Sequence, residues 1–129
     1  MKTAILIFIS SITWLEATAQ SGSDGILGYW TNPDQSQILE FVQNGDTYEA
    51  IIRQSEKPEA IGKTPITGLE YRGNSRYRDG QIYVPQRDMK ADCSIKLFSK
   101  DEFRLTVKVG MMSRKVDWTR VDFENPSEG

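Results

Sequence analysis

Residues 38–53 read ILEFVQNGDTYEAIIR, and the first structural prediction comes from this stretch. Two runs rich in β-branched and aromatic residues, 38–43 and 47–53, flank Asn44-Gly45-Asp46. An Asn-Gly pair supplies the positive φ angles that a tight hairpin turn needs. Tyr48, Ala50 and Ile52 share one face of the second run, because side chains alternate along a strand. The sequence therefore predicts a β-hairpin.

The same period of two continues along most of the chain after Gly25. Phe103, Leu105 and Val107 form an apolar face that alternates with polar residues, which is typical of a sheet with one face in the core. Turn residues separate such runs at short intervals. We expect eight strands, near residues 27–31, 37–43, 47–53, 66–71, 81–84, 91–98, 102–109 and 114–122. The connection 54–65 is the longest and has room for a short helical turn around residues 56–61.

The length of 129 residues favours one domain. Eight short antiparallel strands can bury their apolar faces as two stacked sheets or by closing into one barrel, and closure also removes the exposed edges. We therefore predict an all-β fold, a single eight-stranded antiparallel up-and-down barrel.

Composition excludes several classes of function. The chain has 16 Lys and Arg, 18 Asp and Glu, and no His. With a net charge of −2, the protein lacks the positive electrostatic field that binds a phosphate backbone. We therefore expect no nucleic-acid partner. Without His, the usual general base, the Ser-His and Cys-His pairs and most zinc sites are missing. We expect no catalytic residues, no metal and no cofactor, and predict that the protein is not an enzyme.

The N-terminus has the pattern of an export signal. Lys2 supplies a positive charge, residues 4–15 are mostly apolar, and Ala17-Thr18-Ala19 provides small residues before a cleavage point. The apolar stretch is shorter than the roughly twenty residues of a membrane span. We predict a signal peptide over 1–19, a flexible segment over 20–26, the barrel over 27–122 and a tail over 123–129. The protein would be periplasmic or secreted; the alternative is an N-terminal helix packed on the domain.

Cys93 is the only cysteine, so no internal disulfide can form. It alternates with Ile95 and Leu97, which places all three on one face of a strand. We interpret Cys93 as a buried packing residue.

Five segments, taken in order, resemble a bacterial exported family. They are Gly28-Tyr29-Trp30-Thr31, residues 65–69 (PITGL), residues 79–85 (DGQIYVP), Cys93 and residues 114–121, which end in Trp118-Thr119-Arg120-Val121. Together they are similar to the domain of unknown function DUF2147, across nearly the whole chain after the signal. The resemblance implies a lipocalin-like or streptavidin-like barrel outside the cytoplasm, and no known activity.

Barrels of this type also suggest a role for Gly28, Trp30 and Arg120. In calycin-type barrels, a Gly-x-Trp on the first strand packs against an Arg from the last strand. The guanidinium stacks on the indole while its donors reach main-chain carbonyls. We expect Trp30 and Arg120 to close one end of the barrel in this way.

The candidate ligand site lies at the open end of the expected barrel. We assign it Trp30, Tyr48, Tyr83, Arg114 and Trp118, and predict a small, partly apolar or anionic ligand. Arg114 shares a strand face with Trp118 by parity. Three alternatives follow for Arg114. Its side chain pairs with an internal acid, lies at the mouth where it can bind an anionic group of a ligand, or is solvated because the last strand begins after it.

A second hypothesis is a structural or protein-interaction module of the envelope, with a filled barrel. Its partner would be another protein, met by a turn rich in arginine and tyrosine. That turn comprises Tyr71, Arg72, Arg76, Tyr77, Arg78 and Arg87. The volume of the barrel interior discriminates between the two hypotheses.

Overall fold

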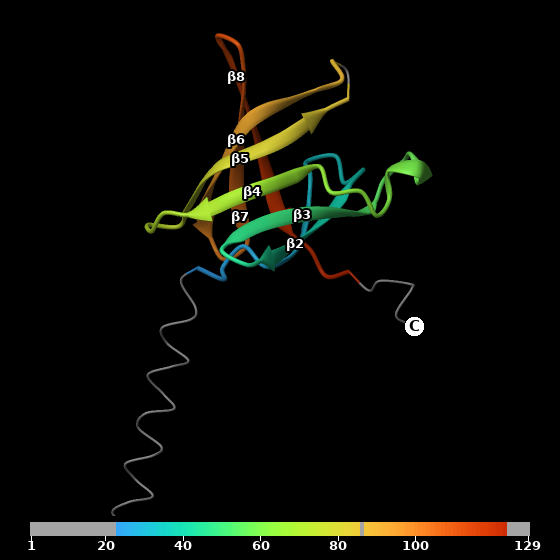
Figure 1. Ribbon diagram of the computed structural model, residues 1–129. Helices are drawn as coiled ribbons and strands as arrows, with labels where there is room; N and C mark the ends of the chain where they lie inside the picture. Colours follow the sequence, from blue (N-terminus) through green and yellow to red (C-terminus); the bar gives the residue numbers. More distant parts are fainter. Residues whose placement is uncertain (1–22, 86, 124–129) are drawn as a thin grey trace, which may run out of the picture.

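The structure, a computed structural model, describes residues 23–85 and 87–123. Eight antiparallel strands form a closed barrel in which each strand pairs with its neighbours in sequence (Figure 1). They are β1 (Gly28–Thr31), β2 (Ile38–Asn44), β3 (Thr47–Gln54), β4 (Ile66–Tyr71), β5 (Arg76–Val84), β6 (Met89–Ser99), β7 (Glu102–Val109) and β8 (Met112–Arg120). The predicted fold class, an eight-stranded antiparallel up-and-down barrel, is confirmed.

The hairpin predicted from residues 38–53 is β2–β3. Gly45 adopts a φ of 63° at the turn, and the register runs from Asn44↔Thr47 to Ile38↔Gln54. The expected helical turn is the short 3₁₀ segment η1 (Pro58–Ala60) in the β3–β4 connection.

The fifth strand was predicted too short. We placed it at residues 81–84, whereas β5 begins at Arg76. The register of β5 against β6 shifts between Tyr77 and Gly80, and Asp79 has a φ of 64°. Such an irregularity breaks the period-two pattern of side chains, which is why the alternation did not reveal residues 76–80 as strand.

The two ends of the barrel differ. In Figure 1 the segment that precedes β1 lies at the lower end, and the β7–β8 turn stands at the top. We call the lower end the closed end; it carries residues 23–27 and the β2–β3, β4–β5 and β6–β7 turns. We call the upper end the open end; it carries the β5–β6 turn and the β7–β8 turn.

The hydrophobic core extends along the barrel, and its aromatic side chains gather toward the closed end. The largest fully buried side chains include Trp30, Phe41, Tyr77 and Phe103. Phe103 contacts Trp30 edge to face at 4.7 Å between ring centroids, and Phe41 at 5.5 Å. Aromatic pairs in these geometries add to the stabilisation from burial itself.

Candidate ligand site at the open end

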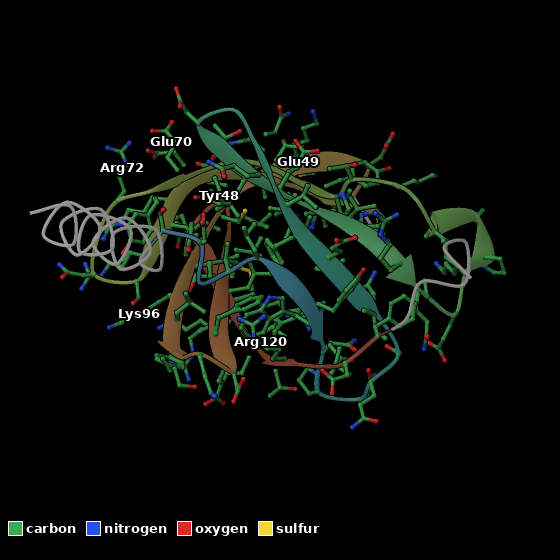
Figure 2. All side chains as sticks on the ribbon, turned by 90° about the horizontal axis from the view of Figure 1, so that it is seen from below. Tyr48, Glu49, Glu70, Arg72, Lys96 and Arg120 are labelled. Atoms are coloured by element: carbon green, nitrogen blue, oxygen red, sulfur yellow. The ribbon has the colours of Figure 1, made fainter. Side chains whose placement is uncertain are left out.

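Arg120 joins the first and last strands at the closed end (Figure 2). Its guanidinium carbon lies 4.2 Å from the centroid of the Trp30 ring. Nε donates to the Lys100 carbonyl at 2.7 Å, Nη1 to Leu27 at 2.9 Å and Nη2 to Gly25 at 2.8 Å. All three guanidinium nitrogens thus hold main-chain carbonyls, as expected for the closing pair.

Gly28 makes this arrangement possible. Its φ is +118°, and a Cβ atom at this position would lie 2.7 Å from Arg120 Nη1. Any larger residue would be strained in its backbone and would press on the guanidinium. Gly28, Trp30 and Arg120 therefore act as one structural unit.

Residues 23–26 cover the closed end of the barrel. The Tyr77 hydroxyl donates to the Ser23 carbonyl at 2.7 Å and accepts from the Ile26 amide at 3.3 Å. The Trp30 indole donates to the Ile26 carbonyl at 2.8 Å, and Ile26 is fully buried. The alternation of strands gave no signal for this cap, because residues 23–26 belong to no strand.

Two tyrosines sit in this low-dielectric region. Burial is the main reason that the pKa of Tyr77 lies well above its ordinary value of 10. Burial is also the main reason that the pKa of Tyr48 is raised. The Tyr48 hydroxyl donates to Asp24 Oδ1 at 3.3 Å. Both hydroxyls therefore serve as neutral hydrogen-bonding groups that hold the N-terminal segment.

Three residues assigned to the mouth do not lie there. Trp30, Tyr48 and Trp118 are all buried members of the core cluster. They belong to strand ends next to the closed end, where the side chains of neighbouring strands fill the interior. The structure therefore corrects the assignment of these three residues to an open mouth.

Tyr83 and Arg114 do come together, at a cavity of about 520 Å³ at the open end. Its walls are mostly apolar and come from β5, β7 and the start of β8, together with the β5–β6 turn. The lining residues are Ile82, Tyr83, Val84, Pro85, Arg87, Val107, Val109, Met112, Ser113 and Arg114. The volume falls in the usual range for small-molecule sites, about 300–1,000 Å³.

Arg114 is the charged group best placed in this cavity. It lies inside β8, which begins at Met112, so the idea that the strand starts after Arg114 is wrong. The register pairs Arg114 with Val107, and both line the cavity. Among the described residues, no carboxylate forms an ion pair with Arg114. Its charge is therefore available to an anionic group.

Tyr83 has a local partner instead. Its hydroxyl donates to Asp88 Oδ1 at 2.7 Å across the β5–β6 turn. This hydrogen bond is the main cause that raises the pKa of Tyr83. Tyr83 thus fixes the turn that carries Arg87, the second cation of the cavity wall.

Trp118 contributes an unusual buried group. Its side chain is 95% removed from solvent and stacks on Phe103 at 6.2 Å between centroids. Among the described residues, its Nε1 is the one buried side-chain nitrogen or oxygen without a hydrogen-bond partner. Such a donor costs free energy unless an acceptor is supplied. It lies on the strand face that leads to Arg114, four residues along β8.

Cys93 and Glu40 have packing and ion-pair roles in the barrel. Burial raises the pKa of the Cys93 thiol to about 12, which disfavours the reactive thiolate. Glu40 lies opposite Ile51 and is bound by Arg53 at 2.9 Å. In the part of the chain that the structure describes, no three metal-ligating side chains gather. No helix there is long and apolar enough to cross a membrane.

The turn rich in arginine and tyrosine is not a single cluster. Tyr77 points into the core, and Arg87 belongs to the opposite end of the barrel. Arg72 is bound by Glu70 and Asp79 on the surface. The β4–β5 turn therefore offers less free positive charge than its composition suggested.

Comparison with solved structures supports a lipocalin-like barrel. Protein HP1028 from the human pathogen Helicobacter pylori, which belongs to the lipocalin family, matches with a TM-score of 0.62 at 14% identity, over 80% of this chain and 87% of that one. A redesigned β-barrel matches with a TM-score of 0.51 at 13% identity, over 79% of this chain and 96% of that one. Identities this low concern the fold alone.

No curated protein matches the chain. The family model described as "Uncharacterized protein conserved in bacteria (DUF2147)" matches residues 28–120. This match spans every strand of the barrel and confirms the resemblance drawn from the five segments. The chain belongs to the DUF2147 family.

Proposed function

We propose that this protein binds, without covalent chemistry, a small amphipathic anion at the open end of its barrel. The observation that carries the proposal is the cavity of about 520 Å³, whose mostly apolar wall holds Arg114 with no carboxylate partner among the described residues. An apolar wall favours an alkyl or ring portion. An unpaired guanidinium favours a carboxylate, sulfonate or phosphate group.

The buried Nε1 of Trp118 is a separate feature, because Trp118 lies next to the closed end and is not among the residues that line the cavity. Acceptor atoms inside the barrel would satisfy its Nε1, which the described residues leave without a partner. A trapped water can do this. The preference for a ligand with a polar group on an apolar body therefore rests on the cavity wall and Arg114.

Export belongs to the proposal as well. It rests on the positive, apolar and small-residue regions of residues 1–19, which lie outside the described residues. The corresponding measurement is the N-terminal sequence of the protein recovered after expression in a bacterial host. We expect it to begin at Gln20; an unprocessed chain retained in the cytoplasm would contradict export.

The binding test compares three probes with the same twelve-carbon chain: dodecanoate, dodecanol and dodecylammonium. Isothermal titration should give the tightest binding for dodecanoate. The variant Arg114→Ala should weaken dodecanoate binding about tenfold or more and leave dodecanol nearly unchanged, because only the anion uses the guanidinium. Arg76→Ala is the matched control, since Arg76 is exposed on β5 and does not line the cavity.

Three results would contradict the proposal. They are no binding of any probe, equal binding of the anion and the cation, or equal losses in Arg114→Ala and Arg76→Ala. The second candidate, a structural or interaction module, is favoured by the filled closed end, where Trp30, Tyr77 and Phe103 leave the interior packed. Absence of probe binding, together with no thermal stabilisation across small anions and lipids, would favour that candidate.

A further inference from the structure

The open end carries an unusual concentration of exposed apolar side chains. Among the described residues, six large hydrophobic side chains are exposed, and four of them lie on the ends of two hairpins, β5–β6 and β7–β8. These four are Tyr83, Met89, Met111 and Met112. Met111 is fully exposed at the β7–β8 turn, and Met112 beside it is 72% exposed.

The same two hairpin ends carry five of the eleven lysines and arginines that form no ion pair among the described residues. Residues 82–90 and 107–115 hold five cations, Arg87, Lys90, Lys108, Arg114 and Lys115, against one acid, Asp88. The whole chain, in contrast, is slightly negative. Within the described residues, none of the five forms an ion pair, whereas Arg53, Arg72, Arg104 and Arg120 each have a carboxylate partner.

The shape of this region limits the kinds of partner that can bind to it. Figure 1 shows the β7–β8 hairpin as a protruding tip, above the level of β2, β3 and β4. Flexible methionine side chains at a protruding turn, with Lys108, Arg114 and Lys115 on the two strands that form it, suit a fluid interface that can deform around them. Anionic headgroups attract such cations from a distance of about a Debye length.

We propose that the open end docks on the surface of a lipid bilayer with anionic headgroups. Met111, with Met112 beside it, enters the interfacial layer, and the lysines and arginines of the two hairpin ends contact the headgroups. The mouth of the cavity then faces the bilayer, from which an amphipathic ligand can pass directly into the barrel. Docking goes beyond the proposed ligand binding and does not require it, because Met111, Lys108 and Lys115 do not line the cavity.

The test uses protein recovered after export, with the same N-terminus verified for every variant by intact mass. Cosedimentation measures partitioning onto phosphatidylcholine vesicles with and without phosphatidylglycerol. We expect binding only where phosphatidylglycerol is present, and weaker binding as salt is raised. Met111→Ser should reduce the partition coefficient about tenfold, because it removes one inserted apolar side chain.

Charge reversal tests the second half of the proposal. The double variant Lys108→Glu with Lys115→Glu should reduce partitioning by about twenty-five-fold or more, since each positive charge lost near the surface removes roughly fivefold and the two new negative charges are repelled as well. Matched controls lie at the closed end: Phe98→Ser removes an exposed aromatic, and Lys96→Glu with Lys100→Glu reverses two charges. The controls should retain vesicle binding.

Docking is overturned if phosphatidylglycerol vesicles bind no protein, or if vesicles with and without phosphatidylglycerol bind the protein equally. It is also overturned if the control variants lose as much vesicle binding as the tip variants. A Met111-dependent dimer in sedimentation velocity without lipid would assign the tip to a second copy instead. Met111, Lys108 and Lys115 do not line the cavity at the open end, so their variants should still bind dodecanoate. Dodecanoate binding without vesicle binding would overturn docking alone, and vesicle binding without dodecanoate binding would overturn the ligand proposal alone.

Discussion

Replacement of Gly28 by alanine tests the closing unit of the barrel. The backbone at Gly28 has a φ of +118°, and the new Cβ would lie 2.7 Å from Arg120 Nη1. Backbone strain of this kind costs about 1–3 kcal/mol. Displacing Nη1 from the Leu27 carbonyl, now 2.9 Å away, adds the loss of a charge-assisted hydrogen bond, about 1.5–3 kcal/mol. Because the Arg120 side chain is partly exposed, we expect a total near the lower end, about 3 kcal/mol.

Urea unfolding followed by tryptophan fluorescence measures this cost. With a slope of about 1–3 kcal/mol per molar urea, the midpoint should fall by about 1–3 M, and the slope itself should not change. Gly62→Ala is the matched control, since Gly62 has a φ of +93° but no atom within 4 Å of the added Cβ. It should show only the cost of strain.

A double-mutant cycle separates strain from the clash. In an Arg120→Ala background the clash disappears, so Gly28→Ala should cost about 1.5 kcal/mol less than in the parent protein. Equal costs in the two backgrounds would show that the guanidinium does not lie against position 28. The reasoning that joins β1 to β8 through Arg120 would then be refuted.

Further measurements concern the closed end. Tyr77→Phe removes the hydroxyl that donates to Ser23 and should cost about 1–2 kcal/mol in urea unfolding; unchanged stability would mean that residues 23–26 do not depend on it. Burial raises the pKa of Tyr77 above 10 and that of Cys93 from 9 to about 12, so both stay protonated in the folded state while the unfolded chain ionises. These two groups should therefore make the free energy of unfolding decrease from pH 9 to 12, and the decrease should be smaller in Tyr77→Phe; a level profile across that range would contradict the burial of both groups. Trp30→Phe should cost about 1–3 kcal/mol more than Trp118→Phe, because only the Trp30 indole has a hydrogen-bond acceptor, and equal losses in thermal unfolding would speak against this.

Period-two alternation was sufficient to predict the strands and the closed barrel. Apolar positions such as Phe103 and Leu105 face inward as expected, and most strand bounds agree within three residues. The prediction failed where the geometry departs from a regular strand. At Tyr77 the irregularity before Gly80 shifts the register, so a fully buried residue appeared in the sequence to belong to a polar turn.

Alternation says which side of the sheet a residue faces, but it does not say how far along the barrel axis the residue lies. Trp30, Tyr48 and Trp118 do face the interior, yet they lie near the closed end. Arg114 faces the same side of β8 as Trp118 and reaches the open end, four residues away. Distance along the axis depends on the register between strands, which only the structure provided.

Side-chain size along β6 and β7 explains why the interior beside these strands is filled at the closed end and hollow at the open end. From the closed end upward, the inward residues of β6 are Leu97, Ile95, Cys93 and Ala91, and those of β7 are Phe103, Leu105, Val107 and Val109. The register sets these series in layers: Leu97 pairs with Phe103, Ile95 with Leu105 and Cys93 with Val107. Each layer therefore fills less of the interior than the one below it, and a barrel of eight strands is wide enough for the unfilled layers to hold a small ligand. Enlarging Val107 to Phe should fill the cavity and abolish dodecanoate binding while the closed end stays folded. A variant that retained dodecanoate affinity with an intact barrel would show that the binding site lies elsewhere.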